Sequence, residues 1–117
     1  MDISFINRKL EKAFNEGAQL EKQHGTSRAK KIRIRMKELR AAESLRDFWP
    51  PKSPPSRCHE LTEGRRKGQF QLSVDLDHPY RLIFVPDHDP VPKLPDGGLD
   101  WSKVAAVKIL GVEDTHG

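Results

Sequence analysis

The spacing of hydrophobic and polar positions changes near the middle of the chain. Before the middle, apolar residues recur three or four positions apart, which is the period of an amphipathic helix. Beyond it they alternate with polar residues, as in a strand with one buried face. Prolines are concentrated between the two patterns, and proline cannot continue a helix. The pattern predicts one domain with a helical half (1–49), an extended Pro-rich linker (50–56) and a sheet (57–116).

The helical half is expected to begin with a short strand. Ile3 and Phe5 alternate with polar neighbours, and Asn7 then offers a side-chain oxygen that can cap a helix. Apolar residues continue at helical spacing until Gly25, a residue that commonly ends helices. This predicts a first helix over about 8–23.

A second helix, beginning at Thr26 or Ser27, is expected to be amphipathic and strongly basic. Its apolar side chains fall on one stripe: Ala29, Ile32, Met36, Leu39 and Ala42. Its cations take the remaining faces: Arg28, Lys30, Lys31, Arg33, Arg35, Lys37 and Arg40. Such a face is either plainly solvated or the footprint of a polyanion, and Lys31 and Arg35 are our candidate contacts to RNA phosphates.

The sheet half predicts antiparallel strands separated by turns rich in glycine, proline and aspartate. The expected strands are 58–62, 69–76, 80–85 and 104–112, the last apolar on both faces as a central strand is. A basic turn over 63–68 and a long loop over 86–102 join them. The fold class is therefore α+β, with a short strand and two helices packed on a small antiparallel sheet of about four strands.

Charge and cysteine content narrow the function classes. The formal net charge of the 117 residues is +4 and the pI is about 9.4, which suits a polyanionic partner such as RNA without requiring one. Cys58 is the single cysteine, so a disulfide within the chain is excluded and a reducing compartment is favoured. No export signature is recognisable, and no apolar run approaches the roughly 18 residues of a membrane span. We expect a cytoplasmic protein without membrane association.

Two histidines, a strand arginine and the basic turn could converge on one face of the sheet. Cleaving RNA without a metal needs a base of near-neutral pKa, a proton donor for the leaving oxygen, and cations beside the phosphate. His59, His116 and Arg81 can supply these functions, with Arg65, Arg66 and Lys67 in the turn contacting phosphates. The spacing of Asp87, His88, Asp89 and Asp96 matches no calcium loop, and the prolines around them indicate an ordinary exposed loop, so no metal site is expected.

Each of these residues also has a purely structural interpretation. His59 can be a partly buried histidine that a backbone group satisfies, and His116 can belong to a frayed tail. Arg81 can pair with Asp75 on the neighbouring strand. The basic turn can be an ordinary solvated hairpin tip. The residues alone leave these alternatives open.

The order and spacing of several short motifs resemble the HigB branch of the RelE toxin superfamily, over nearly the whole chain. The motifs are Ser4-Phe5, Leu10, Phe14, His59-x-Leu61, the Arg/Lys–Gly turn, Tyr80-Arg81-Leu82-Ile83-Phe84 and Asp114-x-His116. The resemblance implies a type II toxin that cleaves mRNA on the ribosome without metal or cofactor. It also implies an antitoxin partner with a HigA-like helix-turn-helix.

By position, the resemblance assigns catalysis to His59, Arg81, Asp114 and His116. Thr115 departs from the pattern because the family carries a tyrosine there, whose ring can stack on a base or share in proton transfer. That departure favours the alternative of a non-catalytic binding module with the same fold. A ParE-like gyrase inhibitor is a further alternative of the same superfamily.

Overall fold

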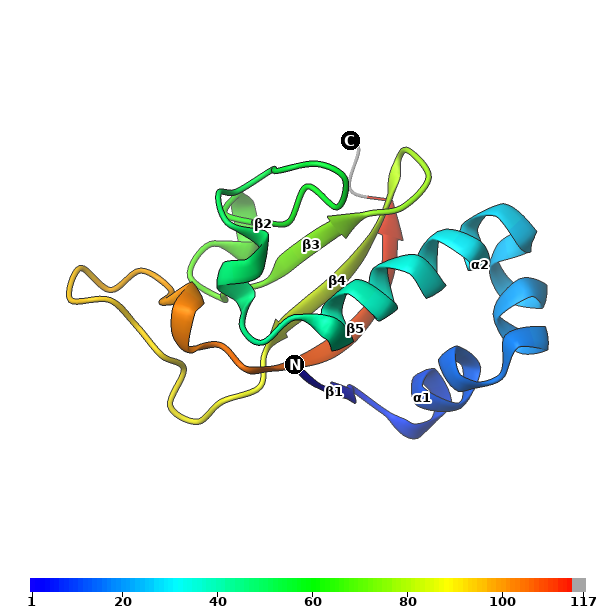
Figure 1. Ribbon diagram of the computed structural model, residues 1–117, viewed down its shortest axis with the longest axis horizontal. Coiled ribbons are helices and arrows are strands. Elements are labelled where there is room, and N and C mark those ends of the chain that lie inside the picture. Colours follow the sequence, from blue (N-terminus) through cyan, green and yellow to red (C-terminus); the bar gives the residue numbers. More distant parts are fainter. Residues whose placement is uncertain (115–117) are drawn as a thin grey trace.

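The computed structural model describes residues 1–114, which form a five-stranded sheet covered on one face by helices (Figure 1). The strands are β1 (Asp2–Phe5), β2 (His59–Glu60), β3 (Leu72–Asp75), β4 (Tyr80–Pro86) and β5 (Ala106–Asp114). The helices are α1 (Arg8–Asn15) and α2 (Gly17–Ala41), with short 3-10 turns η1 (Leu45–Phe48), η2 (Gly64–Arg66) and η3 (Trp101–Lys103). The expected α+β class is confirmed.

The sheet differs from the expected one in size and direction. Its order is β1-β5-β4-β3-β2, and β1 pairs with β5 in parallel whereas all other pairs are antiparallel. The expectation of an antiparallel sheet of about four strands is therefore wrong, because the first strand joins the sheet. A parallel pair requires a long connection between its strands, and here most of the chain separates β1 from β5.

The helical half contains a break that the apolar spacing did not reveal. Asn7 caps α1 as expected, accepting a hydrogen bond from the Leu10 amide at 2.8 Å. The single helix expected over 8–23 is wrong, because Glu16 leaves the helical conformation between α1 and α2. Gly25 is non-helical within α2 (φ 80°), in agreement with the expected boundary there. The N-terminal helical run is thus two short segments.

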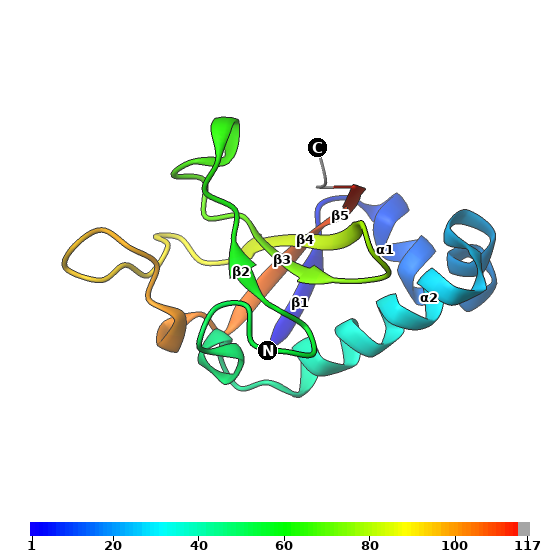
Figure 2. The same cartoon turned by 90° about the horizontal axis from the view of Figure 1, so that it is seen from above.

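The core lies between α2 and the face of the sheet below it (Figure 2). Every member of the predicted stripe is buried, and its members within α2 pack with the inward side chains of the central strands. The largest of these are Ile32, Leu39, Leu82, Phe84 and Ile109, each at most 1% exposed. Burying one such side chain contributes about 1.5–3 kcal/mol. This apolar layer holds the sheet in place and leaves its other face available for polar groups.

Two expected strands are shorter than predicted. Only His59–Glu60 of 58–62 is a strand, and only Leu72–Asp75 of 69–76. Phe70 adopts a positive φ of 56°, a conformation that interrupts an extended chain. The expected strands 80–85 and 104–112 are present with shifted ends, and β5 is flanked on both sides by other strands, as its apolar character predicted.

A β-bulge in β5 sets which side chains reach the polar face at its end. Ile83 pairs with Gly111 and Phe84 with Ile109, so that Leu110 is an extra residue on β5. Gly111 has a φ of 146°, which favours glycine. The bulge changes the inward side chains of β5 from odd to even positions and directs Glu113 to the face that carries Arg81.

Among the described residues, none of the helices combines the length and apolar character needed to cross a membrane.

Candidate functional site

Strand register brings polar side chains together on the sheet face opposite α2. His59 lies across from Ser73, Asp75 across from Arg81, and Arg81 across from Glu113. Directly paired residues of an antiparallel sheet project to the same side. Four neighbouring strands therefore contribute to one polar surface.

An open cleft of about 840 Å³ borders this surface. Residues of the arm that carries η2, of the Pro-rich segment and of the loop that ends at η3 contribute to its lining. Figure 2 shows that arm and that loop as two projections of the backbone. Its lining residues are Trp49, Pro51, Lys52, Arg57, His59, Glu60, Leu61, Thr62, Glu63, Arg66, Arg81, Leu99, Trp101 and Asp114. Of the predicted site residues, the cleft brings together His59, Arg66, Arg81 and Asp114.

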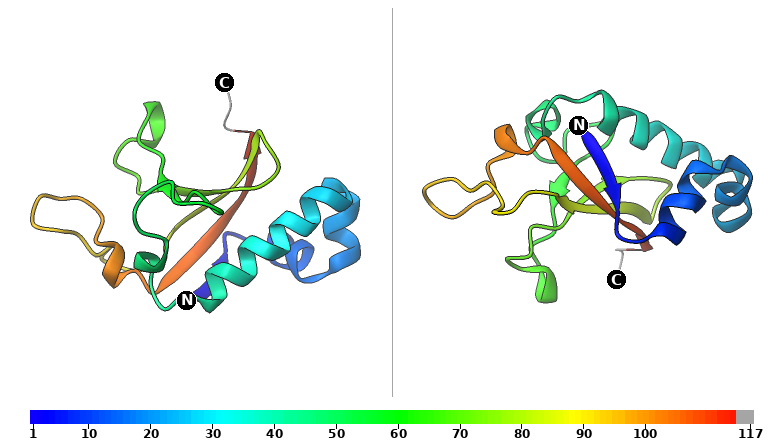
Figure 3. Two further views of the ribbon diagram at one scale, coloured as in Figure 1. Left: turned by 45° about the horizontal axis from the view of Figure 1, so that its top comes forward. Right: turned by 90° about the horizontal axis from the view of Figure 1, so that it is seen from below.

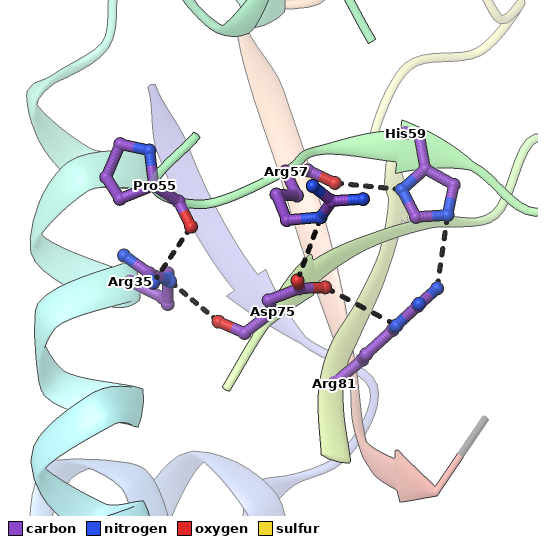
Figure 4. Close-up of polar contacts among 6 residues, drawn as sticks. All are labelled: Arg35, Pro55, Arg57, His59, Asp75 and Arg81. Atoms are coloured by element: carbon purple, nitrogen blue, oxygen red, sulfur yellow. Dashed lines mark hydrogen bonds and ion pairs between the residues drawn. The ribbon is translucent and has the colours of Figure 1, made fainter. Parts of the chain in front are cut away.

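A chain of polar contacts runs through the cleft wall (Figure 4). The Arg57 carbonyl lies 2.8 Å from His59 Nδ1, and Arg81 Nη1 lies 3.1 Å from His59 Nε2. A carbonyl can only accept and a guanidinium can only donate, so Nδ1 carries the proton and Nε2 keeps its lone pair. His59 is therefore held as a neutral imidazole whose basic nitrogen meets a cation.

Burial lowers the pKa of His59 below the ordinary value of 6.5. The positive charges of Arg81 and Lys52 lower this pKa further, whereas the hydrogen bond to the Arg57 carbonyl and the charge of Asp75 act against them. The net direction is downward. At neutral pH the imidazole is unprotonated, which is the state that a general base requires.

Asp75 forms ion pairs with both arginines of this series of contacts, Arg57 and Arg81. Its carboxylate lies 3.4 Å from Arg57 Nε and 3.4 Å from Arg81 Nε. The structural pairing of Arg81 with Asp75 is thus present, and so is the placement of Arg81 in the cleft. Asp75 holds the Nε edge of Arg81, while the Nη1 edge faces His59.

The basic turn divides into one residue that lines the cleft and two that do not. Arg66 Nη2 lies 2.9 Å from Glu113 Oε2, which ties the η2 arm to the end of β5. Arg65 and Lys67 are exposed and do not line the cleft. Arg65 borders a smaller hollow of about 430 Å³, which Arg66 also lines.

Arg35 is buried, contrary to its expected place on a solvated helix face. Its side chain is 7% exposed, and its Nε donates to the Asp75 carbonyl at 2.7 Å. Nη1 donates to Glu38 at 3.0 Å and Nη2 to the Pro55 carbonyl at 3.2 Å. Because all three nitrogens already have protein partners, we do not include Arg35 in the candidate site. Lys31 is exposed on α2 and does not line the cleft.

The C-terminal pair of predicted residues is described only in part. Asp114 is the last residue of β5 and lines the cleft. Thr115 and His116 lie outside the described residues, so the expected convergence of His116 on the cleft stays a prediction.

The Pro-rich segment contributes cleft residues that sequence reasoning missed. The expected extended linker is wrong, because the segment folds back: the Lys52 amide donates to the Cys58 carbonyl at 2.9 Å and the Arg57 amide to the Ser53 carbonyl at 2.8 Å. Positive φ angles at Lys52 and Arg57 allow this compact loop. The loop places Lys52 and Arg57 in the cleft, and the only sequence signal was their charge.

Two further features bear on the chemistry available in the cleft. Burial raises the pKa of the Glu60 carboxyl above its ordinary value. Within residues 1–114, no three histidine, cysteine, aspartate or glutamate side chains gather as ligands of a metal ion do.

Comparisons with models of protein families, with curated proteins and with solved structures gave no match.

Proposed function

We propose that this protein is an endoribonuclease that uses His59 as the base and Arg81 as the phosphate contact, and needs no metal for either role. The observation that carries the proposal is the contact between the two side chains. The lone pair of His59 Nε2 meets Arg81 Nη1 at 3.1 Å in an open cleft. A base and a cation in contact match the 2′-hydroxyl and the phosphate of one nucleotide, which are also neighbours.

The proposed reaction is an attack by the RNA on itself. His59 Nε2 takes the proton of a 2′-hydroxyl, and the 2′-oxygen forms a bond to the adjacent phosphorus. The bond from phosphorus to the 5′-oxygen breaks, which leaves a 2′,3′-cyclic phosphate and a 5′-hydroxyl. Arg81 turns its Nη edge from His59 to the phosphate while Asp75 retains the Nε edge. By the resemblance, His116 gives the 5′-oxygen its proton and Asp114 supports it.

The biological setting of the proposal comes from the motif resemblance. We place the protein as the toxin of a type II toxin–antitoxin pair that cleaves mRNA on the ribosome and inhibits translation in the cytoplasm. Its partners are the ribosome with its mRNA and an antitoxin with a HigA-like helix-turn-helix. Arg65, Lys67 and Lys31 stay candidate contacts to RNA outside the cleft, because all three are exposed cations.

Primer extension on a reporter message after brief expression in a bacterial host tests the proposal. We expect cuts linked to codons, which disappear when the start codon of the reporter is removed. His59→Gln and Arg81→Met are expected to abolish the cuts and relieve growth arrest at unchanged protein levels. His24→Gln and Arg40→Met are matched controls in α2, outside the cleft, and are expected to cut like the parent.

Three results would overturn the proposal. Intact messages during growth arrest, together with inhibited gyrase, would identify a ParE-like inhibitor. Intact messages without arrest, from a protein that still binds RNA or an antitoxin, would identify a non-catalytic binding module. Cuts that persist in both cleft variants would show a ribonuclease with a different site.

A further inference from the structure

An exposed tryptophan lies in the same cleft as the candidate catalytic pair. Trp49 is 58% exposed, more than any other large hydrophobic residue of the described chain. Isolated exposed hydrophobic residues are common on protein surfaces and need no special explanation. Trp49 differs from that case because it lines the cleft together with His59 and Arg81.

The Trp49 ring is supported from below by a second tryptophan. Trp101 meets it edge to face, with ring centroids 5.2 Å apart and planes at 88°. Trp101 is only 7% exposed and belongs to the core cluster. The two rings thus join an exposed aromatic surface to the packed interior.

The backbone around both rings is fixed by short hydrogen-bonded turns. Trp49 caps η1 and donates its amide to the Arg46 carbonyl at 2.9 Å, while the buried Leu45 donates to the Val104 carbonyl at 2.9 Å just beyond η3. Asp100 caps η3 through the Ser102 amide at 3.1 Å. Figure 1 shows η1 and η3 (orange) side by side, so two neighbouring hydrogen-bonded turns position the pair of rings.

Charge beside the rings favours a nucleic acid over an uncharged apolar ligand. Lys52, Arg57, Arg66 and Arg81 line the cleft, and their charges outnumber those of the three carboxylates there. The Arg57 side chain is 52% exposed and that of Arg81 is 32% exposed, so both can reach a ligand. Aromatic rings next to cations bind single-stranded RNA by stacking on bases and neutralising phosphates.

We propose that Trp49, supported by Trp101, is a stacking platform for an unpaired RNA base next to the cleavage site. This inference rests on the proposed ribonuclease function and deepens it by naming single-stranded RNA with an unstacked base as the substrate.

Binding of a short oligoribonucleotide with methylated 2′-hydroxyls tests the platform, because such RNA cannot undergo the proposed attack. We expect Trp49→Leu to weaken its binding by about 5- to 150-fold, from a stacking energy of about 1–3 kcal/mol per base. Trp49→Phe is expected to retain most of the affinity. Ile34→Ala removes an exposed apolar side chain from α2 and is expected to change nothing.

A fluorescence readout separates stacking from an indirect effect of the substitution. The chain has two tryptophans, so Trp101→Phe leaves Trp49 as the only indole, and its emission is expected to be quenched by the methylated oligonucleotide. In a series of oligonucleotides that each lack one base, we expect a single one, whose missing base is the one that stacks on Trp49, to bind weakly and to leave the emission unquenched. Fluorescence anisotropy of a labelled oligonucleotide compares the affinities for intact and abasic RNA in the parent protein, which keeps Trp101.

The outcomes distinguish this inference from the function on which it rests. Equal affinity for parent and Trp49→Leu, or for intact and abasic RNA, would overturn the platform, even if the protein cleaves RNA. Binding that depends on Trp49, combined with intact unmodified RNA on translating ribosomes, would uphold the platform and overturn the ribonuclease. A protein that binds no RNA would overturn both.

Discussion

The two faces of the sheet differ in composition and burial, although the same strands form both. On the face below α2, Leu72, Val74, Leu82 and Phe84 are at most 1% exposed and form the core. On the opposite face, the described side chains that pair across the strands are mostly charged or polar, apart from the buried Ile83 and the partly buried Val85. The difference indicates that the packed face supplies most of the stability, which leaves the other free to carry reactive groups. Figure 3 shows α2 running along the packed face of the sheet.

Arg35 and Arg81 show the same difference between the two faces, because both contact Asp75 but from opposite sides of the sheet. Arg35 reaches the Asp75 carbonyl from α2, and all its nitrogen atoms have protein partners (Figure 4). Arg81 reaches the Asp75 carboxylate from β4, and its side chain is 32% exposed at the cleft. Burial and full hydrogen bonding make Arg35 a structural residue, whereas partial exposure leaves Arg81 able to bind a ligand.

The largest expected effect tests the apolar face. Phe84→Ala removes a fully buried ring from the central strand and is expected to lower the free energy of unfolding by about 3–5 kcal/mol. Urea denaturation followed by circular dichroism measures it. Leu94→Ala, at an exposed position, is the control and is expected to change stability by less than about 0.5 kcal/mol. Equal effects would contradict the division of labour between the faces.

The two arginines predict opposite consequences of one substitution. Arg35→Met removes a buried guanidinium and leaves the partly buried Asp75 and Pro55 carbonyls and Glu38 without their donor, so it is expected to cost about 2–3 kcal/mol of stability. Arg81→Met breaks partly exposed contacts and is expected to cost less than about 1 kcal/mol.

Activity should reverse that order. Arg35→Met is expected to cleave RNA at nearly the parent rate at temperatures where it is folded, and Arg81→Met is expected to be inactive. Urea denaturation and primer extension on the same two variants provide the comparison. A folded but inactive Arg35→Met would place this arginine in the function after all.

The bulge in β5 predicts a smaller loss of stability. Gly111→Ala forces a side chain into a φ of 146° and is expected to cost about 1–2 kcal/mol. It is also expected to weaken the Arg66–Glu113 contact, because the bulge directs Glu113 to the polar face. Gly17→Ala, whose φ is not in this range, is the control for urea denaturation. Its added methyl would lie 3.1 Å from Nη2 of the exposed Arg33 side chain, which can shift into solvent, so a smaller loss is expected. A neutral Gly111→Ala would show that the bulge needs no glycine.

Local spacing explains which parts of the fold could be predicted. The buried stripe of α2 followed from the helical period, because apolar residues at that period mark the side of a helix that is buried. The same period places Arg35 three residues after Ile32 and four before Leu39, so the burial of Arg35 could have been found had its charge not been taken to require solvent. The parallel pairing of β1 could not, because it depends on a partner about a hundred positions away.

The candidate site was predictable where it lies on strands and hidden where it lies on loops. The strand period by itself predicts that Asp75 and Arg81 share one face, because cross-strand neighbours project to the same side. Trp49 and Arg57 were missed as site residues, since the prolines around them predict an extended linker and give no indication that the segment folds back. The proximity of a loop to a sheet is a tertiary property that local spacing does not record.

The smallest effect concerns the protonation of His59 on the polar face. Burial, with Arg81 and Lys52, holds its pKa below the 6.5 of an unfolded histidine. The unfolded chain therefore binds this proton more readily, so the stabilising contribution of neutral His59 is complete above pH 6.5 and is lost as pH falls through the lowered value.

Cleavage is expected to show its acid limb below pH 6.5. NMR titration of the ring protons is expected to place the midpoint there, and Arg81→Met is expected to raise it, while the midpoint of His24 in α2 stays unchanged. A midpoint at or above 6.5 in the parent, or one that Arg81→Met leaves in place, would contradict the contact on which the proposed base depends.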